Sequence, residues 1–390
     1  MRLPPLMACA LALACASPAL AAPRAHHPRA FARRRERAQP PPSPEALLGR
    51  AALAVLVQAG KNSDPEVRSS AAAAWGELGN PAAKPLLVKM LKDKDGSVRL
   101  AAAKSLYALG DKAAFAIILD IAKTEPKAPD NPSPIDELKL MVKERLRIDA
   151  IRELRAIGKG DTKLGEKAVK AFETTLDDPY GPVRDATAEA LAGLGLDEFT
   201  ARFLTAAKSS NPGVRVAAVQ ALGHIGTPKA VAAVAAAAED SDASVRSEVM
   251  SAAAHFSAAD AVPLLTKGLA DSDADVRAQA LQTLADFDDQ ASSAAVQNAF
   301  ANAPDLSTEL IAAQGLLRRG DAVDLSTVKP ALSNSDEDIR KLGLDLLALT
   351  PGAESLDLLK SEMEKDDSKL LRVDAARIIL KRLEPRRGKK

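Results

Sequence analysis

The chain has 390 residues, of which 47% are hydrophobic but only 3% aromatic, and this balance argues against one deep globular core. Its 53 basic and 52 acidic residues give a net charge of +1. The chain as a whole therefore lacks the basic character that nucleic-acid-binding proteins use to displace counterions.

The first 21 residues have the pattern of a secretory signal peptide. A short positive start precedes an apolar stretch that ends in a small-x-small cleavage site at Ala21. Prolines interrupt this stretch, which argues against a permanent membrane span. Both cysteines, Cys9 and Cys15, lie inside it. We expect an exported protein of the periplasm or cell envelope; the alternatives are a lipoprotein acylated at Cys15 and a transit peptide.

Residues 22–44 and 384–390 are predicted to be basic flanking segments. The first holds six arginines, one acid and a run of prolines, which favours an extended, disordered tether over an anchor to acidic lipid. It contributes a charge of +5, and residues 381–390 contribute another +5. About −10 is left on residues 45–380. An acidic region behind an export signal argues against nucleic acid as a partner.

A Val-Arg pair returns every 31 residues through much of residues 45–383. A fixed period in this range indicates stacked structural repeats. Extending the spacing to degenerate copies gives ten units, with anchors at positions 68, 99, 147, 184, 215, 246, 277, 309, 340 and 372. Glu309 replaces the arginine in one of them.

Each unit has the signals of two helices. Apolar residues follow the anchor at helical spacing, as in Val67, Ala71, Trp75 and Leu78, so Trp75 is expected in the core. A glycine eleven residues after the anchor often ends the helix, and a second apolar helix follows. Eight anchors have a good N-cap residue four positions earlier: Asp64, Asp95, Asn211, Asp242, Asp273, Asp305, Asp336 and Ser368.

The pattern Asp-x-x-Val-Arg-x-x-Ala-x-x-Ala-Leu-x-x-Leu-Gly resembles the HEAT repeat, in the short bacterial form also seen in phycobilin lyase subunits. The resemblance implies an all-α fold, an α-solenoid of about ten stacked two-helix repeats in which each unit contacts its neighbours. It also implies a scaffold or partner-binding protein, with the second helices of the units on the concave side.

The repeated arginines could form a row of anion sites, but a structural role is favoured. In HEAT-like stacks this arginine resembles a ladder that reaches an Asp in an adjoining loop, and acids lie six residues before five of the anchors. The predicted ladder comprises Arg68, Arg99, Arg147, Arg184, Arg215, Arg246, Arg277, Arg340 and Arg372.

His224, His255 and Asp286 occupy the same offset in three consecutive units, which raises the alternative of a metal row. Stacked units are spaced by roughly 10 Å, and this spacing argues against shared coordination. The sequence shows no phosphate loop, haem motif or nucleophile paired with a base. We therefore expect no catalytic residue, no cofactor and no metal.

The period breaks between anchors 99 and 147, where residues 123–134 carry four prolines. Insertions in repeat proteins map to loops that often form the binding face. Ser133-Pro134 is predicted to start a long helix toward Ile157, and further extra length falls near residues 159–165.

Aligning the second helices places several lysines in one row, which predicts a patch for a protein partner of acidic character. The predicted partner-binding residues are Lys89, Lys92, Asp120, Lys123, Lys208 and Lys267. We expect an exported, non-catalytic scaffold or adaptor. The alternatives are an accessory factor of an enzyme, similar to a chromophore lyase, and a structural envelope protein held near the membrane by its linker.

Overall fold

The computed structural model describes residues 42–384, apart from residues 128 and 130. The predicted signal peptide at 1–21, nearly all of the 22–44 segment and all but the first residue of the 384–390 tail lie outside the described residues. Within the described part there are twenty α-helices, four short 3₁₀ helices and no β-strand. The predicted all-α solenoid of ten two-helix units is confirmed.

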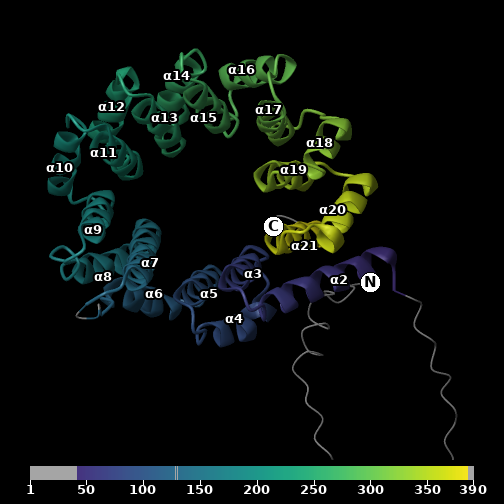
Figure 1. The fold of residues 1–390 in the computed structure, drawn as a ribbon, viewed down its shortest axis with the longest axis horizontal. Coiled ribbons are helices and arrows are strands. Elements are labelled where there is room, and N and C mark those ends of the chain that lie inside the picture. The colour runs from purple at the N-terminus through teal and green to yellow at the C-terminus, as the bar shows by residue number, and fades with distance from the viewer. Residues whose placement is uncertain (1–41, 128, 130, 385–390) are drawn as a thin grey trace, which may run out of the picture.

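Ten helices carry the anchor positions, and they form the inner layer of the molecule (Figure 1). They are α3 (Pro65–Glu77), α5 (Gly96–Ala108), α7 (Pro134–Gly160), α9 (Gly181–Gly193), α11 (Pro212–Ile225), α13 (Ala243–Ala252), α15 (Ala274–Leu284), α17 (Leu306–Arg318), α19 (Glu337–Leu349) and α21 (Lys369–Leu383).

The other ten helices alternate with these along the chain and form the outer layer (Figure 1). They are α2 (Pro44–Ala59), α4 (Lys84–Met90), α6 (Ala114–Lys123), α8 (Thr162–Phe172), α10 (Thr200–Ala206), α12 (Pro228–Ala236), α14 (Ala258–Gly268), α16 (Gln290–Ala301), α18 (Leu325–Leu332) and α20 (Ala353–Lys365). The 3₁₀ helices are η1 (Pro81–Ala83), η2 (Asp197–Phe199), η3 (Ala237–Glu239) and η4 (Ala253–His255).

The expectation that the second helix of each unit lines the concave side is wrong. The chain starts with an outer helix, so each unit is an outer helix followed by the inner helix that carries the anchor. A periodic sequence does not reveal where one unit ends and the next begins. The predicted pairing was therefore displaced by one helix, and the two layers were exchanged.

The helix ends follow the sequence closely. All eight predicted N-cap side chains accept a backbone N–H at the start of their helix. Gly226 ends α11 with a φ of 69°, a conformation that favours glycine. Gly158 differs, because it lies buried inside α7, where an added Cβ would come within 2.8 Å of the Gly165 Cα. Because Gly158 has no side chain, α7 and α8 can approach each other closely at this point.

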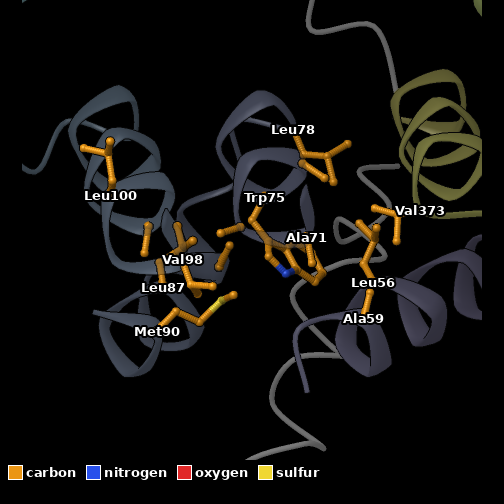
Figure 2. Close-up of a cluster of buried hydrophobic side chains, with 14 of the residues drawn as sticks. Leu56, Ala59, Ala71, Trp75, Leu78, Leu87, Met90, Val98, Leu100 and Val373 are labelled. Atoms are coloured by element: carbon orange, nitrogen blue, oxygen red, sulfur yellow. The ribbon is translucent and has the colours of Figure 1, made fainter. Parts of the chain in front are cut away.

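The solenoid closes on itself, which the sequence did not predict. The outer helix α2 of the first unit packs along α21 of the last unit, and α3 also contacts α21. Leu56 of α2 is fully buried and Val373 of α21 is 2% exposed. Figure 2 shows these two side chains grouped beside Ala71 and Trp75 of the first unit. One apolar cluster therefore runs from the first units into the last ones.

Polar contacts join the same two ends. Arg377 of α21 donates from Nη1 to Oε2 of Glu77 at the end of α3, at 2.9 Å. A Cβ added at Gly49 would lie 3.4 Å from Cδ1 of Leu383, so the first and last helices are in van der Waals contact. Opening the ring would expose several buried aliphatic side chains, at about 1.5–3 kcal/mol each.

We expect the closed ring to persist in solution. A variant with Gly49→Cys and Leu383→Cys, in a background where both native cysteines are replaced, should be joined within one chain by a short bismaleimide. The control pairs Gly49→Cys with Lys267→Cys in the remote α14. Gel mobility after cross-linking provides the measurement. If neither pair reacts before denaturation, the solenoid is open.

Candidate functional site

The repeated arginines form a ladder along the loops that join the outer helix to the inner helix of each unit. Arg246 donates from Nε and Nη2 to the two carboxylate oxygens of Asp271, each at 2.8 Å. Its Nη1 donates to the carbonyl oxygens of Asp240 and Ser241 in its own loop. Each rung thus ties one unit to the loop of the next. The same arrangement joins Arg68 to Asp93, Arg215 to Asp240 and Arg340 to Asp366.

Three of the predicted ladder arginines form incomplete rungs. Arg99, Arg184 and Arg277 donate to the carbonyl oxygens of their own loops, five and six residues earlier. The residue 25 positions later is Thr, Ser or Asn at these three, whereas it is Asp at the rungs of Arg68, Arg215 and Arg246. Arg372 lies half-buried in the first turn of α21, in the last unit.

Arg147 occupies a modified rung because α7 extends through the position of the usual loop. Its guanidinium is 3% exposed and pairs with Asp178 of the next unit and with Glu144 one turn earlier, at 2.8 Å. Its Nε donates to the carbonyl oxygen of Ala122. Burial raises the pKa of Glu144, although the hydrogen bond from Arg147 opposes that change. This rung anchors the long helix.

The six predicted partner-binding residues all lie exposed on the outer layer. Lys267 forms an ion pair with Glu239 of the neighbouring unit. Lys89 is in α4 and Lys92 just after it, Asp120 and Lys123 are in α6, Lys208 follows α10 and Lys267 is in α14. The row therefore faces away from the ring rather than along its concave wall, and partner binding by these residues stays a prediction.

The residues of the suggested metal row are arranged differently from the expectation. The rings of His224 and His255 have centroids 4.9 Å apart, well under the expected spacing of the units. Asp286 does not join them, because it forms an ion pair with Arg318 of α17. Among the described residues, no group of three or more His, Cys, Asp or Glu side chains is placed to hold a metal ion.

The inner wall carries a hollow of about 740 Å³ beside the ring closure, lined by α3, α5, α7, α19 and α21. Lys104 pairs across it with Glu153 at 2.9 Å, and Lys341 pairs with Asp374 at 3.5 Å. The carboxylates outnumber the cations in this lining. They belong to Glu66, Asp149, Glu153, Glu337, Asp338 and Asp374.

The start of α7 carries an exposed apolar stripe that the sequence reasoning missed. Ile135, Leu138, Met141 and Val142 are 65%, 61%, 55% and 64% exposed. Their spacing of three and seven residues places them on one face of the helix. This segment follows the Pro-rich insertion, and α7 has 27 residues whereas the other inner helices have at most 15. The signal was available as apolar residues at helical spacing ahead of the anchor Arg147.

The alternating two-layer stack of helix pairs defines the protein as an α-solenoid. The family model for HEAT repeats matches residues 53–130, 168–252, 200–285 and 233–317, which together cover more than half of the chain. The chain belongs to the HEAT-repeat family. No curated protein sequence matches it.

Several solved structures are similar to this chain at low identity. Human deoxyhypusine hydroxylase in complex with glycerol is 20% identical over 70% of this chain and 97% of its own, with a TM-score of 0.30. The complex of CpcE and CpcF of phycocyanin lyase from Nostoc is 22% identical over 67% and 94%, with a TM-score of 0.36. The Escherichia coli protein YibA is 17% identical over 73% and 100%, with a TM-score of 0.35.

The ladder predicts a difference between two arginines at equivalent positions. Arg246→Ala should reduce the free energy of unfolding by about 1–3 kcal/mol, because it strands the Asp271 carboxylate and two carbonyls. Arg277→Ala, which removes only bonds to loop carbonyls, should cost less than about 1 kcal/mol. Denaturant melts measure both, and equal losses would contradict the role of the Asp.

The loss of stability caused by Arg246→Ala should depend on pH. The hydrogen bond from Arg246 is the main cause that lowers the pKa of Asp271 to about 2. A carboxyl with a lowered pKa in the folded state stabilises the fold above its ordinary pKa, and this stabilisation is lost as the pH falls through the folded value. The stability gap between the native chain and Arg246→Ala should therefore narrow between about pH 4 and pH 2.

Proposed function

We propose that this protein is a non-catalytic scaffold that binds a protein partner, and that the partner docks on the exposed stripe of α7. The stripe is the observation that carries the proposal. It consists of Ile135, Leu138, Met141 and Val142, each more than half exposed. Contiguous exposed apolar side chains of this kind mark interaction surfaces, whereas scattered single ones are ordinary.

The position of the stripe supports a docking role. The helix is anchored in the ring through the buried Arg147 rung, and α6 packs against it. The capping box formed by Ser133 and Asp136 fixes its first turn. A rigid, preorganised helix face loses little conformational freedom when a partner binds.

The charges around the stripe indicate the kind of partner. Lys139 and Lys143 follow Ile135 at intervals of four residues and therefore border the stripe along one edge. Lys123 ends the neighbouring α6, and Arg145 is also exposed. A partner with an apolar patch bordered by carboxylates would match this surface. The outer lysines Lys89 and Lys92 would extend the same complementarity if the partner spreads over the outer layer.

The accessory-factor alternative has one specific observation in its favour. The hollow of about 740 Å³ at the ring closure is large enough for a small molecule, although its lining is mostly charged. The envelope-protein alternative rests on the basic 22–44 segment alone. A small-molecule role predicts ligand binding that depends on residues of the hollow such as Lys104, and not on the stripe.

Partner capture from the native envelope fraction tests the proposal. Leu138→Asp with Val142→Asp should abolish capture, because two carboxylates would be placed in the apolar contact. Leu47→Asp is the matched control, since Leu47 is 52% exposed on α2, in a different unit from the stripe and from Lys89, Lys92 and Lys123. Reversal of Lys89, Lys92 and Lys123 to Glu should weaken capture in a salt-sensitive way. Capture that survives the α7 double substitution would contradict the docking site.

Export is a separate part of the proposal and rests on the pattern of residues 1–21. Across residues 42–384, apart from 128 and 130, no helix is both long and apolar enough to cross a membrane. N-terminal sequencing of the protein from its native host should give a chain that begins near Ala22. A chain that retains Met1 would contradict export, and an acylated Cys15 at the N-terminus would favour the lipoprotein alternative.

A further inference from the structure

Two basic side chains of α7 and two imidazoles from two later units meet on the inner wall between α7 and α13. Arg155 stands eight residues after its anchor, and His224 and His255 stand nine after theirs. Lys159 is one turn beyond Arg155 on α7. These offsets continue the helix face that lines the hollow at the ring closure, where Ala73 and Lys104 stand five residues after their anchors. The group therefore lies toward the inner side of the ring.

Two glycines make this meeting possible. Gly193 occupies the same offset as the histidines, and a Cβ there would lie 2.9 Å from Cδ of Arg155. Arg155 uses this space to cross α9, and its Nη1 donates to Oε1 of Glu189 at 3.3 Å and to the carbonyl oxygen of His224 at 3.1 Å. At Gly223 a Cβ would lie 2.6 Å from that of Ala252. This close approach of α11 and α13 brings the two imidazoles together.

Two carboxyl groups lie close to this cluster. Oε1 of Glu189 is shared, since it also lies 2.9 Å from Nδ1 of His224. Glu248 of α13 is the other nearby carboxyl, and burial raises its pKa. Burial lowers the pKa of Arg155, Lys159 and His255, and the neighbouring cations lower each of them further. Arg155 and Lys159 therefore hold like charges close together.

Two buried N–H donors near this cluster lack an acceptor within the described part of the chain. Among the residues that the structure describes, Nε of Arg155 is buried and has no acceptor, and the same holds for Nε of Arg152 one turn earlier. Buried polar groups without a partner are rare and costly. Beside this cluster, Lys159 and Gly193 line a hollow of about 580 Å³ between α7, α8 and α9. Lys159 is the member of the cluster that lines this hollow, together with Lys170 and the carboxyl groups of Glu166 and Glu173. An oxyanion beside Lys159 and Arg155 would accept from these charged donors.

We propose that Arg155, Lys159, His224 and His255 form an anion site that takes a carboxylate side chain of an acidic protein segment. The inference rests on the proposed partner-binding function and specifies one of its contacts. Its four side chains come from three units, those of α7, α11 and α13, with Gly193 of α9 between them, so a bound segment would cross the junctions between units. In the ring it is separate from the exposed stripe of α7, whose residues precede Arg147 on the same helix.

Titration with a hexaglutamate peptide at low salt tests the site directly, with hexaglutamine as the uncharged control. The native ring should bind hexaglutamate and not hexaglutamine, and the affinity should fall as the salt concentration rises. Lys159→Gln with His255→Gln should weaken binding by about tenfold or more. Both residues are exposed, so the fold should tolerate the change.

A matched variant removes two positive charges elsewhere. Lys163→Gln with Lys167→Gln alters exposed residues of α8 and should leave the affinity unchanged. Equal weakening by both double variants would overturn the site and indicate nonspecific attraction. Binding of inorganic phosphate without binding of hexaglutamate would overturn the assignment to a protein segment. Because the α7 stripe is tested by partner capture, failure of either idea would be visible without the other.

Discussion

The contact between a unit and its successor is the constraint on which the whole structure depends. Each junction buries the apolar faces of two inner helices, and at complete rungs an arginine fork clamps the loop of the next unit, as Arg246 clamps Asp271. Because the same geometry recurs along the chain, small rotations at the junctions add up. Ten such units bring α21 back to α2 and α3, and the stack becomes a ring (Figure 1).

Ring closure covers the apolar end faces that an open solenoid exposes. The end units of an open stack expose an apolar face, and capping repeats with a polar outer side are normally required. Here the two ends cover each other, so Leu56 and Val373 are buried in a core that is continuous through the seam. This seam is sealed by α2 lying along α21 and by the Arg377–Glu77 pair.

Local structure could be predicted from the sequence, whereas the closed ring could not. Caps such as Asp64 and the pairing of Arg68 with Asp93 could be predicted because each depends on a fixed short spacing. Curvature depends instead on side-chain volume where helices cross. At Gly76, an added Cβ would lie 2.5 Å from Oγ of Ser105, and such close approaches set the angle between units. Their sum over ten junctions cannot be judged from a repeat pattern.

For the candidate site too, the residue types could be predicted from the sequence, whereas their placement in the fold could not. The lysines of the outer row were recognised by type, but their layer was assigned wrongly because the repeat has no intrinsic starting point. The histidines were aligned correctly, yet their contact depends on Gly223, whose neighbour Ala252 belongs to another unit. The stripe on α7 could not be recognised as exposed from its spacing, because apolar residues at helical spacing ordinarily mark a buried helix face.

Specificity in a ring of similar units must come from the places where the units differ. The regular positions are committed to the junctions, since Val98, Leu106 and their equivalents are buried and the complete rungs hold the loops. The two surfaces proposed for recognition both involve α7, the helix at the largest break in the period. Its first turns expose apolar side chains, and Arg155 near its end crosses the neighbouring unit. Under the proposed function, the helix that this break lengthens gives an otherwise repetitive ring a distinct side for recognition.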